Sequence, residues 1–301
     1  MNKGDSTTEG MIILAVLLVI IILMPKGSPN STDNTSQNTS SNGAVISTPN
    51  SSYAQDITIN SGNAAYVYQS YEEYITIYNY GRNSIDITNW QLKNGKDKRA
   101  YDSGGSLQYF SSDIAIIPKA ALFISPYGYS ALQNVVLKSG EQAIVTTGVM
   151  GSQSPYKIVS FKENSCSGYL EDLPEYAFTP PLSRNCPRPA DELGVSNQSS
   201  ECRKFIERMS SCHTPEFDTR DRDGEICHNC VDGTPLTSSC VAFIKNHFNY
   251  NSCIANHSSD TNFSGQTWRI FLGKGWEMWA KEYETIELFD QLGRLVEYRD
   301  Y

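Results

Sequence analysis

Apolar and polar residues alternate through positions 72–92, EEYITIYNYGRNSIDITNWQL. One run of β-branched and aromatic residues covers 74–78 and a second covers 85–88, with Gly81 and two asparagines between them. Alternation with a period of two, interrupted by a Gly/Asn turn, predicts two antiparallel strands that each bury one face.

The second of these runs changes parity before it ends. Trp90 and Leu92 continue it, but they fall on the opposite parity to Ile85 and Ile87. If all four side chains are buried, a bulge or a crossing to another sheet must lie near Asn89.

More short runs of this kind follow, most of them bounded by Pro, Gly, Ser or Asn. They lie at 114–117, 121–124, 134–137, 143–146 and 157–160, and then, after a long gap, at 268–272, 284–290 and 295–298. Short strands separated by turn residues predict a mainly β protein with a sandwich architecture rather than parallel βαβ units.

Both ends of this β-rich region resemble one known family. The order Tyr-Ile-x-Ile-x-Asn, turn, Ile-x-Ile-Thr-x-Trp-x-Leu at 74–92 and the closing run Thr-Ile-x-Leu-x-Asp-x-x-Gly-x-Leu-Val at 285–296 resemble the lamin tail domain. The resemblance implies an immunoglobulin-like β-sandwich split into two parts, 53–162 and 265–301. Asn89 stands where the family usually has Gly, and Asn tolerates the left-handed backbone that such a turn requires.

The N-terminal part has a different character. Residues 1–27 include an apolar stretch, 11–24, without a charge. As a helix it would be about 21 Å long, and no small-residue cleavage site follows it, which favours a retained membrane anchor over a cleaved signal. Residues 28–52 are mostly Ser, Thr, Asn and Gln, which predicts a disordered linker.

Net charge excludes one class of partner. The formal net charge of the chain is −9, and no Lys/Arg run is longer than two. Nucleic acids and anionic lipid surfaces require a basic patch, so no nucleic-acid partner is expected.

Residues 163–264, called the insertion below, contain every cysteine and every histidine of the chain. Helical spacing of apolar residues predicts two helices in it, 200–212 and 238–249, with Ser200 and Ser238 as N-caps. An even number of cysteines outside the cytoplasm predicts disulfides, and an oxidising exterior then suits the bulk of the chain. The candidates are Cys166, Cys186, Cys202, Cys212, Cys227, Cys230, Cys240 and Cys253.

Zinc is the alternative for part of this set. Cys227 and Cys230 form a C-x-x-C motif, Cys212 lies upstream and His257 downstream, and tetrahedral zinc accepts such mixtures. No second C-x-x-C pair is present, so disulfides without a cofactor are the favoured interpretation.

Catalytic signatures are missing from the sequence. It has no H-E-x-x-H, G-x-S-x-G or P-loop motif, which predicts a protein that is not an enzyme. Trp90 and Trp268 lie in strand patterns and are expected in the core, whereas Trp276 and Trp279 are better candidates for exposure.

The resulting expectation is a membrane-anchored, extracytoplasmic interaction or adhesion module at the cell surface. Its lamin-tail-like scaffold would present the cysteine-rich insertion to a protein or glycan partner, because specificity usually lies on loops held by a rigid scaffold. Three alternatives stay open: an accessory protein for an extracellular hydrolase or nuclease, a zinc-binding surface protein, and a purely structural spacer in the cell envelope.

Overall fold

The computed structural model describes the chain from Asn50 onward with short gaps. The described residues are 50–95, 98–101, 107–110, 113–125, 128–129, 131–150, 156–220, 224–231, 233–281 and 284–301. The predicted membrane helix at 11–24 and residues 28–49 of the predicted linker lie outside them. In the part that is described, no helix combines the length and the apolar character needed to cross a bilayer.

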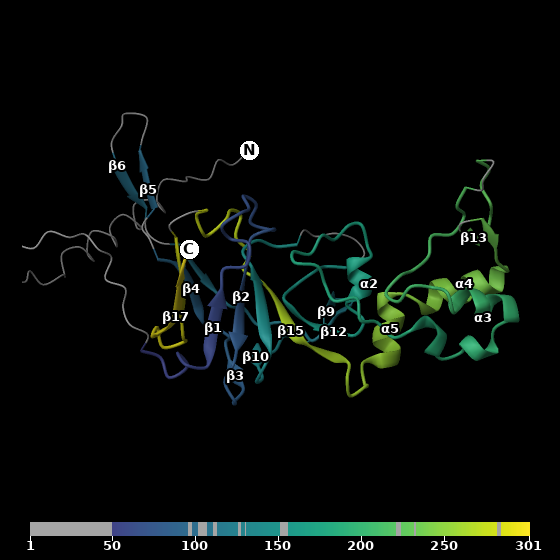
Figure 1. The fold of residues 1–301 in the computed structure, drawn as a ribbon, viewed down its shortest axis with the longest axis horizontal. Helices are drawn as coiled ribbons and strands as arrows, with labels where there is room; N and C mark the ends of the chain where they lie inside the picture. Colours follow the sequence, from purple (N-terminus) through teal and green to yellow (C-terminus); the bar gives the residue numbers. More distant parts are fainter. Residues whose placement is uncertain are drawn as a thin grey trace, which may run out of the picture. The chain divides into compact units, whose positions relative to one another are not determined.

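Two sheets make up most of the β structure (Figure 1). In spatial order, the first contains β1 (Ile57–Asn60), β2 (Tyr74–Asn79), β11 (Gln142–Thr146), β15 (Ser264–Phe271) and β12 (Phe161–Asn164). The second contains β17 (Leu295–Asp300), β16 (Thr285–Phe289), β4 (Gln91–Asn94) and β7 (Ile114–Ile116). Neighbouring strands are antiparallel except β11 and β15, which are parallel.

Four further strand pairs are short. They are β3 (Ile85–Asp86) with β10 (Val136–Leu137), β5 (Lys98–Tyr101) with β6 (Leu107–Phe110), β8 (Ile124–Ser125) with β9 (Gly128–Tyr129), and β13 (Cys230–Val231) with β14 (Thr234–Pro235).

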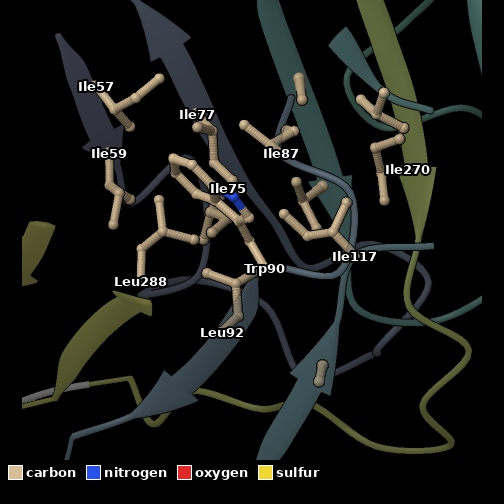
Figure 2. Close-up of a cluster of buried hydrophobic side chains, with 14 of the residues drawn as sticks. Ile57, Ile59, Ile75, Ile77, Ile87, Trp90, Leu92, Ile117, Ile270 and Leu288 are labelled. Atoms are coloured by element: carbon tan, nitrogen blue, oxygen red, sulfur yellow. The ribbon is translucent and has the colours of Figure 1, made fainter. Parts of the chain in front are cut away.

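Both large sheets contribute to one apolar core. Ile75 and Ile77 of β2 are fully buried while their neighbours in the strand are only half-buried, which is the predicted alternation. Leu92 of β4 and Leu288 of β16 belong to the same cluster, and Figure 2 shows these side chains converging between the strands. The fold is therefore mainly β and consistent with a sandwich.

Strands on either side of the insertion pair with one another. β15, the first strand at the C-terminal end of the insertion, lies between β11 and β12. In the second sheet, β16 pairs with β4, which comes from the part of the chain before the insertion. The two parts of the β region thus share both sheets.

The parity change near Asn89 is a crossing between strand pairs. β3 pairs with β10, whereas β4 belongs to the second large sheet. Asn89 has φ 64°, and the crossing buries both Ile87 and Trp90. A left-handed residue reverses the local direction of the backbone, which is how consecutive side chains reach the same core.

Three expectations for the β region need correction. The runs 121–124 and 157–160 are not strands, because β8 begins only at Ile124 and β12 only at Phe161. The folded part begins before residue 53, since the backbone N–H groups of Asn50 and Ser51 both donate to the carbonyl of Leu295. The Ser51 hydroxyl also donates to the buried carboxylate of Asp290 at 2.8 Å, so the polar residues here cap a turn.

The third correction concerns Trp279. Trp276 is 62% exposed as expected, but Trp279 is only 1% exposed. The buried carboxylate of Glu73 accepts hydrogen bonds from the backbone N–H groups of Met278 and Trp279, at 2.7 and 3.2 Å. These bonds hold an irregular segment against the core, which the local pattern cannot reveal.

Helices occur only in the insertion among the described residues. They are α2 (Gly168–Glu171), α3 (Ser200–Ile206), α4 (Ser238–His247) and α5 (Tyr250–His257), with short 3-10 turns at Pro189–Asp191 and Val195–Asn197. A second apolar cluster, which includes six of the cysteines, forms beneath them.

The two predicted helices exist, but their ends differ from the prediction. Ser199 and Thr237, one residue earlier than expected, are the N-caps because their hydroxyls accept from Cys202 N and Cys240 N. The first helix stops before residue 212, where Cys212 has φ 59°. The second is followed by a separate helix, α5, that begins after Asn249 and was not predicted.

Candidate binding site in the cysteine-rich insertion

All eight cysteines are paired. The disulfides join Cys166 to Cys253, Cys186 to Cys212, Cys202 to Cys240 and Cys227 to Cys230. The first three connect residues 26 to 87 positions apart, so each removes much chain entropy from the unfolded state, worth about 2–4 kcal/mol. The fourth spans three positions and constrains the unfolded chain least.

The residues considered for zinc are used otherwise. Cys212, Cys227 and Cys230 are in disulfides, and both ring nitrogens of His257 lie against carboxylates. Within the described ranges, no group of three or more His, Cys, Asp or Glu side chains is arranged to hold a metal ion.

His257 instead belongs to a histidine–carboxylate cluster beside α4 and α5. Its Nε2 lies 2.9 Å from Glu192 Oε1 and its Nδ1 lies 2.8 Å from Asp260 Oδ2. The other oxygen of Glu192 is 3.5 Å from His247 Nε2. Burial opposes the charged imidazolium, but the bonds to Asp260 and Glu192 outweigh it and raise the pKa of His257 above its usual value.

A pocket of about 360 Å³, called the insertion pocket below, opens beside the C-terminal end of α3. Its lining residues are Phe205, Arg208, Met209, Ser210, His213, Pro215, Val231 and Thr234. The first four come from α3 and the turn that follows it, the next two follow Cys212, and the last two come from the β13–β14 hairpin.

Covalent and polar links hold two of these lining segments to other parts of the insertion. The disulfide of Cys202 ties α3 to α4, and the disulfide of Cys212 ties the segment before His213 to Cys186. His213 Nδ1 lies 2.8 Å from Asp172 Oδ2, which orients the imidazole. The parts of the pocket contributed by α3 and by the segment around His213 therefore need little ordering when a ligand binds.

The lining combines apolar and polar side chains in similar measure, and Arg208 is its arginine. Phe205, Met209, Pro215 and Val231 supply apolar surface. Arg208 is exposed, and its Nε donates to the Lys204 carbonyl at 3.0 Å. A guanidinium held in this way in the same lining as apolar side chains suits a ligand that combines an apolar group with a carboxylate.

Hydrolytic chemistry has less support at this pocket. Asp172 and His213 form a pair like the orienting half of a catalytic triad. Among the described residues, however, no hydroxyl is hydrogen-bonded to the His213 ring, although Ser210 lines the same pocket. The nucleophile–base contact on which nucleophilic catalysis depends is thus not formed there.

Sequence reasoning had noted some of these residues for other reasons. The predicted helix at 200–212 covers Phe205 and Met209, but its pattern gives no sign of a pocket. Arg208, Pro215, Val231 and Thr234 carried no signal, because only the disulfide-bonded fold brings two segments about twenty residues apart to one pocket.

Comparison with known proteins adds no relative to this picture. No family model, no curated protein and no solved structure matches the chain.

Proposed function

We propose that this chain is a non-catalytic interaction module, anchored in a membrane by residues 11–24 and exposed to the extracytoplasmic side. Four disulfides support an oxidising compartment, since such bonds are rare in the cytosol. The apolar run in the sequence and the polar linker after it support an anchor with a tether.

For the scaffold we propose an immunoglobulin-like sandwich of the lamin-tail type. The strand-and-turn order of residues 74–92 and the left-handed Asn89 before Trp90 support this assignment. So does the pairing of late strands with early ones, because a split domain of this family requires it. The scaffold itself needs no cofactor.

The observation that carries the function is the insertion pocket. It brings four apolar side chains and the guanidinium of Arg208 together, on a segment without a role in either large sheet. We infer that it receives an apolar side chain adjacent to a carboxylate, presented by a protein partner.

The expected affinity of one such contact is low. Burying a single large apolar side chain is worth about 1.5–3 kcal/mol, and an exposed ion pair adds about 0.2–1 kcal/mol. A short peptide would therefore bind weakly, and useful avidity would come from many anchored copies on one surface.

A peptide titration of the full-length chain in detergent tests this function. The probe is a blocked Leu-Asp dipeptide, compared with Leu-Asn and Ser-Asp, and binding is followed by ligand-observed NMR. We expect Leu-Asp to give the strongest saturable signal, because it alone has both features.

Variants assign that signal to the pocket. Met209→Asp places a carboxylate in the pocket and should abolish binding, whereas Leu193→Asp changes a 74% exposed residue elsewhere in the insertion and should not. Equal signals from the three dipeptides, or unchanged binding in Met209→Asp, would remove the support for this function.

A further inference from the structure

A second cavity lies where the insertion leaves and rejoins the sheet. β12 and β15 pair as Phe161 with Arg269 and Lys162 with Trp268, but the register shifts before Asn164, which faces Ser264. A bulge of this kind takes side chains out of the ladder and redirects them. Here it opens a groove of about 420 Å³.

The groove, called the polar groove below, has a distinctive lining. Its residues are Glu163, Asn164, Ser165, Ser183, Asn185, Asn262, Phe263, Gly265, Gln266 and Thr267. Apart from Glu163, Phe263 and Gly265, every one of these side chains is an uncharged amide or hydroxyl.

A buried ion pair makes the groove rigid. Arg269 Nε donates to Glu163 Oε1 at 2.5 Å. The two terminal nitrogens of the same guanidinium donate to the carbonyls of Pro180 and Pro181, at 2.6 and 2.8 Å. One side chain thus joins the floor of the groove to the segment that carries Ser183, so that wall needs little ordering on binding.

Gly265 lets the two strands come close enough to shape the floor. A Cβ atom at this position would lie 2.9 Å from the carbonyl oxygen of Glu163, which is closer than real contacts allow. Any larger residue would push the strands apart and change the groove.

The charge of the groove excludes ionic ligands as its main target. The one charged lining residue, Glu163, is neutralised by Arg269. What remains available are groups that both donate and accept hydrogen bonds. In the described part of the chain, the side chains of Asn185, Asn262 and Gln266 have no hydrogen-bond partner, so their full capacity is open to a ligand.

The geometry points to a neutral saccharide as the ligand of the polar groove. Sugar hydroxyls both donate and accept hydrogen bonds, as do the amides and hydroxyls of this lining. The cavity volume lies within the range of small-ligand sites. This site is separate from the insertion pocket and does not depend on the function proposed for it.

Saturation-transfer NMR on the full-length chain tests the saccharide site. The probes are maltose, cellobiose, mannobiose and diacetylchitobiose, with a disaccharide containing one uronic acid as the anionic comparison. We expect saturable transfer from at least one neutral disaccharide, with little dependence on salt concentration because no net charge is involved.

Matched variants locate the binding. The double variant Asn262→Ala/Gln266→Ala removes two exposed amides and should weaken binding at least tenfold, while Gln291→Ala, an exposed amide in the β16–β17 turn, should leave it unchanged. Met209→Asp in the insertion pocket should also leave it unchanged. The proposal is overturned if no neutral disaccharide saturates, if the double variant binds as well as the wild type, or if the uronic acid is preferred and salt abolishes its binding.

Discussion

Arg269 and Glu163 form a buried ion pair that joins β15, at the end of the insertion, to β12, at its start. The two side chains are only 4% and 9% exposed, and the guanidinium also donates to two proline carbonyls. Breaking a buried pair from one side leaves an uncompensated charge, which typically costs about 3–5 kcal/mol.

We therefore predict that Arg269→Met lowers the free energy of unfolding by about 3–5 kcal/mol in a urea titration. Arg269→Met/Glu163→Gln, which removes both charges, should recover most of the loss. A single variant within about 0.5 kcal/mol of wild type would show that the pair has no role in stability.

Local patterns were sufficient to predict much of the β core. The alternation at Ile75 and Ile77 indicates the buried face of β2, and the parity change indicates the crossing at Asn89. Both signals depend on residues within one or two strands, which is the range over which sequence periodicity acts.

Contacts between residues far apart in the chain could not be predicted from local sequence patterns. The burial of Trp279 depends on Glu73, which lies about two hundred residues earlier in the chain. Eight cysteines allow 105 pairings, so the disulfides could be expected but not their partners. The insertion pocket is lined by segments about twenty residues apart in the chain, and for that reason its lining could not be predicted.

Asn89 has a left-handed backbone with φ 64°, which Asn tolerates well. We expect the stability of Asn89 variants to depend on how well the new residue tolerates this conformation. Asn89→Ala should lower the free energy of unfolding by about 1–2 kcal/mol, because a Cβ without a compensating polar group is strained in this region. Asn89→Gly should be neutral or slightly stabilising, measured in the same urea titration. A neutral Ala variant would show that the turn does not need this conformation.

Glu73 predicts a pH dependence in the sandwich. Burial raises the pKa of this carboxyl, and the bonds from the backbone N–H groups of Met278 and Trp279 only partly offset that effect. A raised pKa in the folded state means that the contribution of Glu73 is greatest below about pH 4.5 and declines as the pH rises through the folded pKa.

The matched variant is Glu73→Gln, which cannot ionise. We expect the stability of wild type relative to Glu73→Gln to fall between about pH 4 and pH 7, measured by chemical denaturation at each pH. A constant difference across this range would contradict the raised pKa.

The four disulfides should differ in their effect on stability. Removing the pair Cys202 and Cys240, 38 positions apart, should cost about 4 kcal/mol, and removing Cys227 and Cys230, three positions apart, about 2 kcal/mol. Both pairs are replaced by serine so that no odd thiol is left.

Non-reducing intact mass should first show wild type about 8 Da below the reduced chain, two hydrogens for each of four bonds. Free thiols in the oxidised protein would overturn the pairing.

His257 should titrate above its usual range because two carboxylates face it. We expect an NMR midpoint for the His257 ring above about 6.5, and a lower midpoint in Glu192→Gln, which removes one carboxylate and leaves Asp260 in place. Because the pKa of His257 is higher in the folded state than in the unfolded state, protonation of His257 stabilises the folded insertion. This contribution is fully present below about pH 6.5 and is lost as the pH rises through the pKa of the folded state. Wild type should therefore lose stability relative to His257→Gln as the pH rises from about 6 to 8, with His247 present in both proteins. A midpoint unmoved by Glu192→Gln would mean that the Glu192 contact does not stabilise the imidazolium.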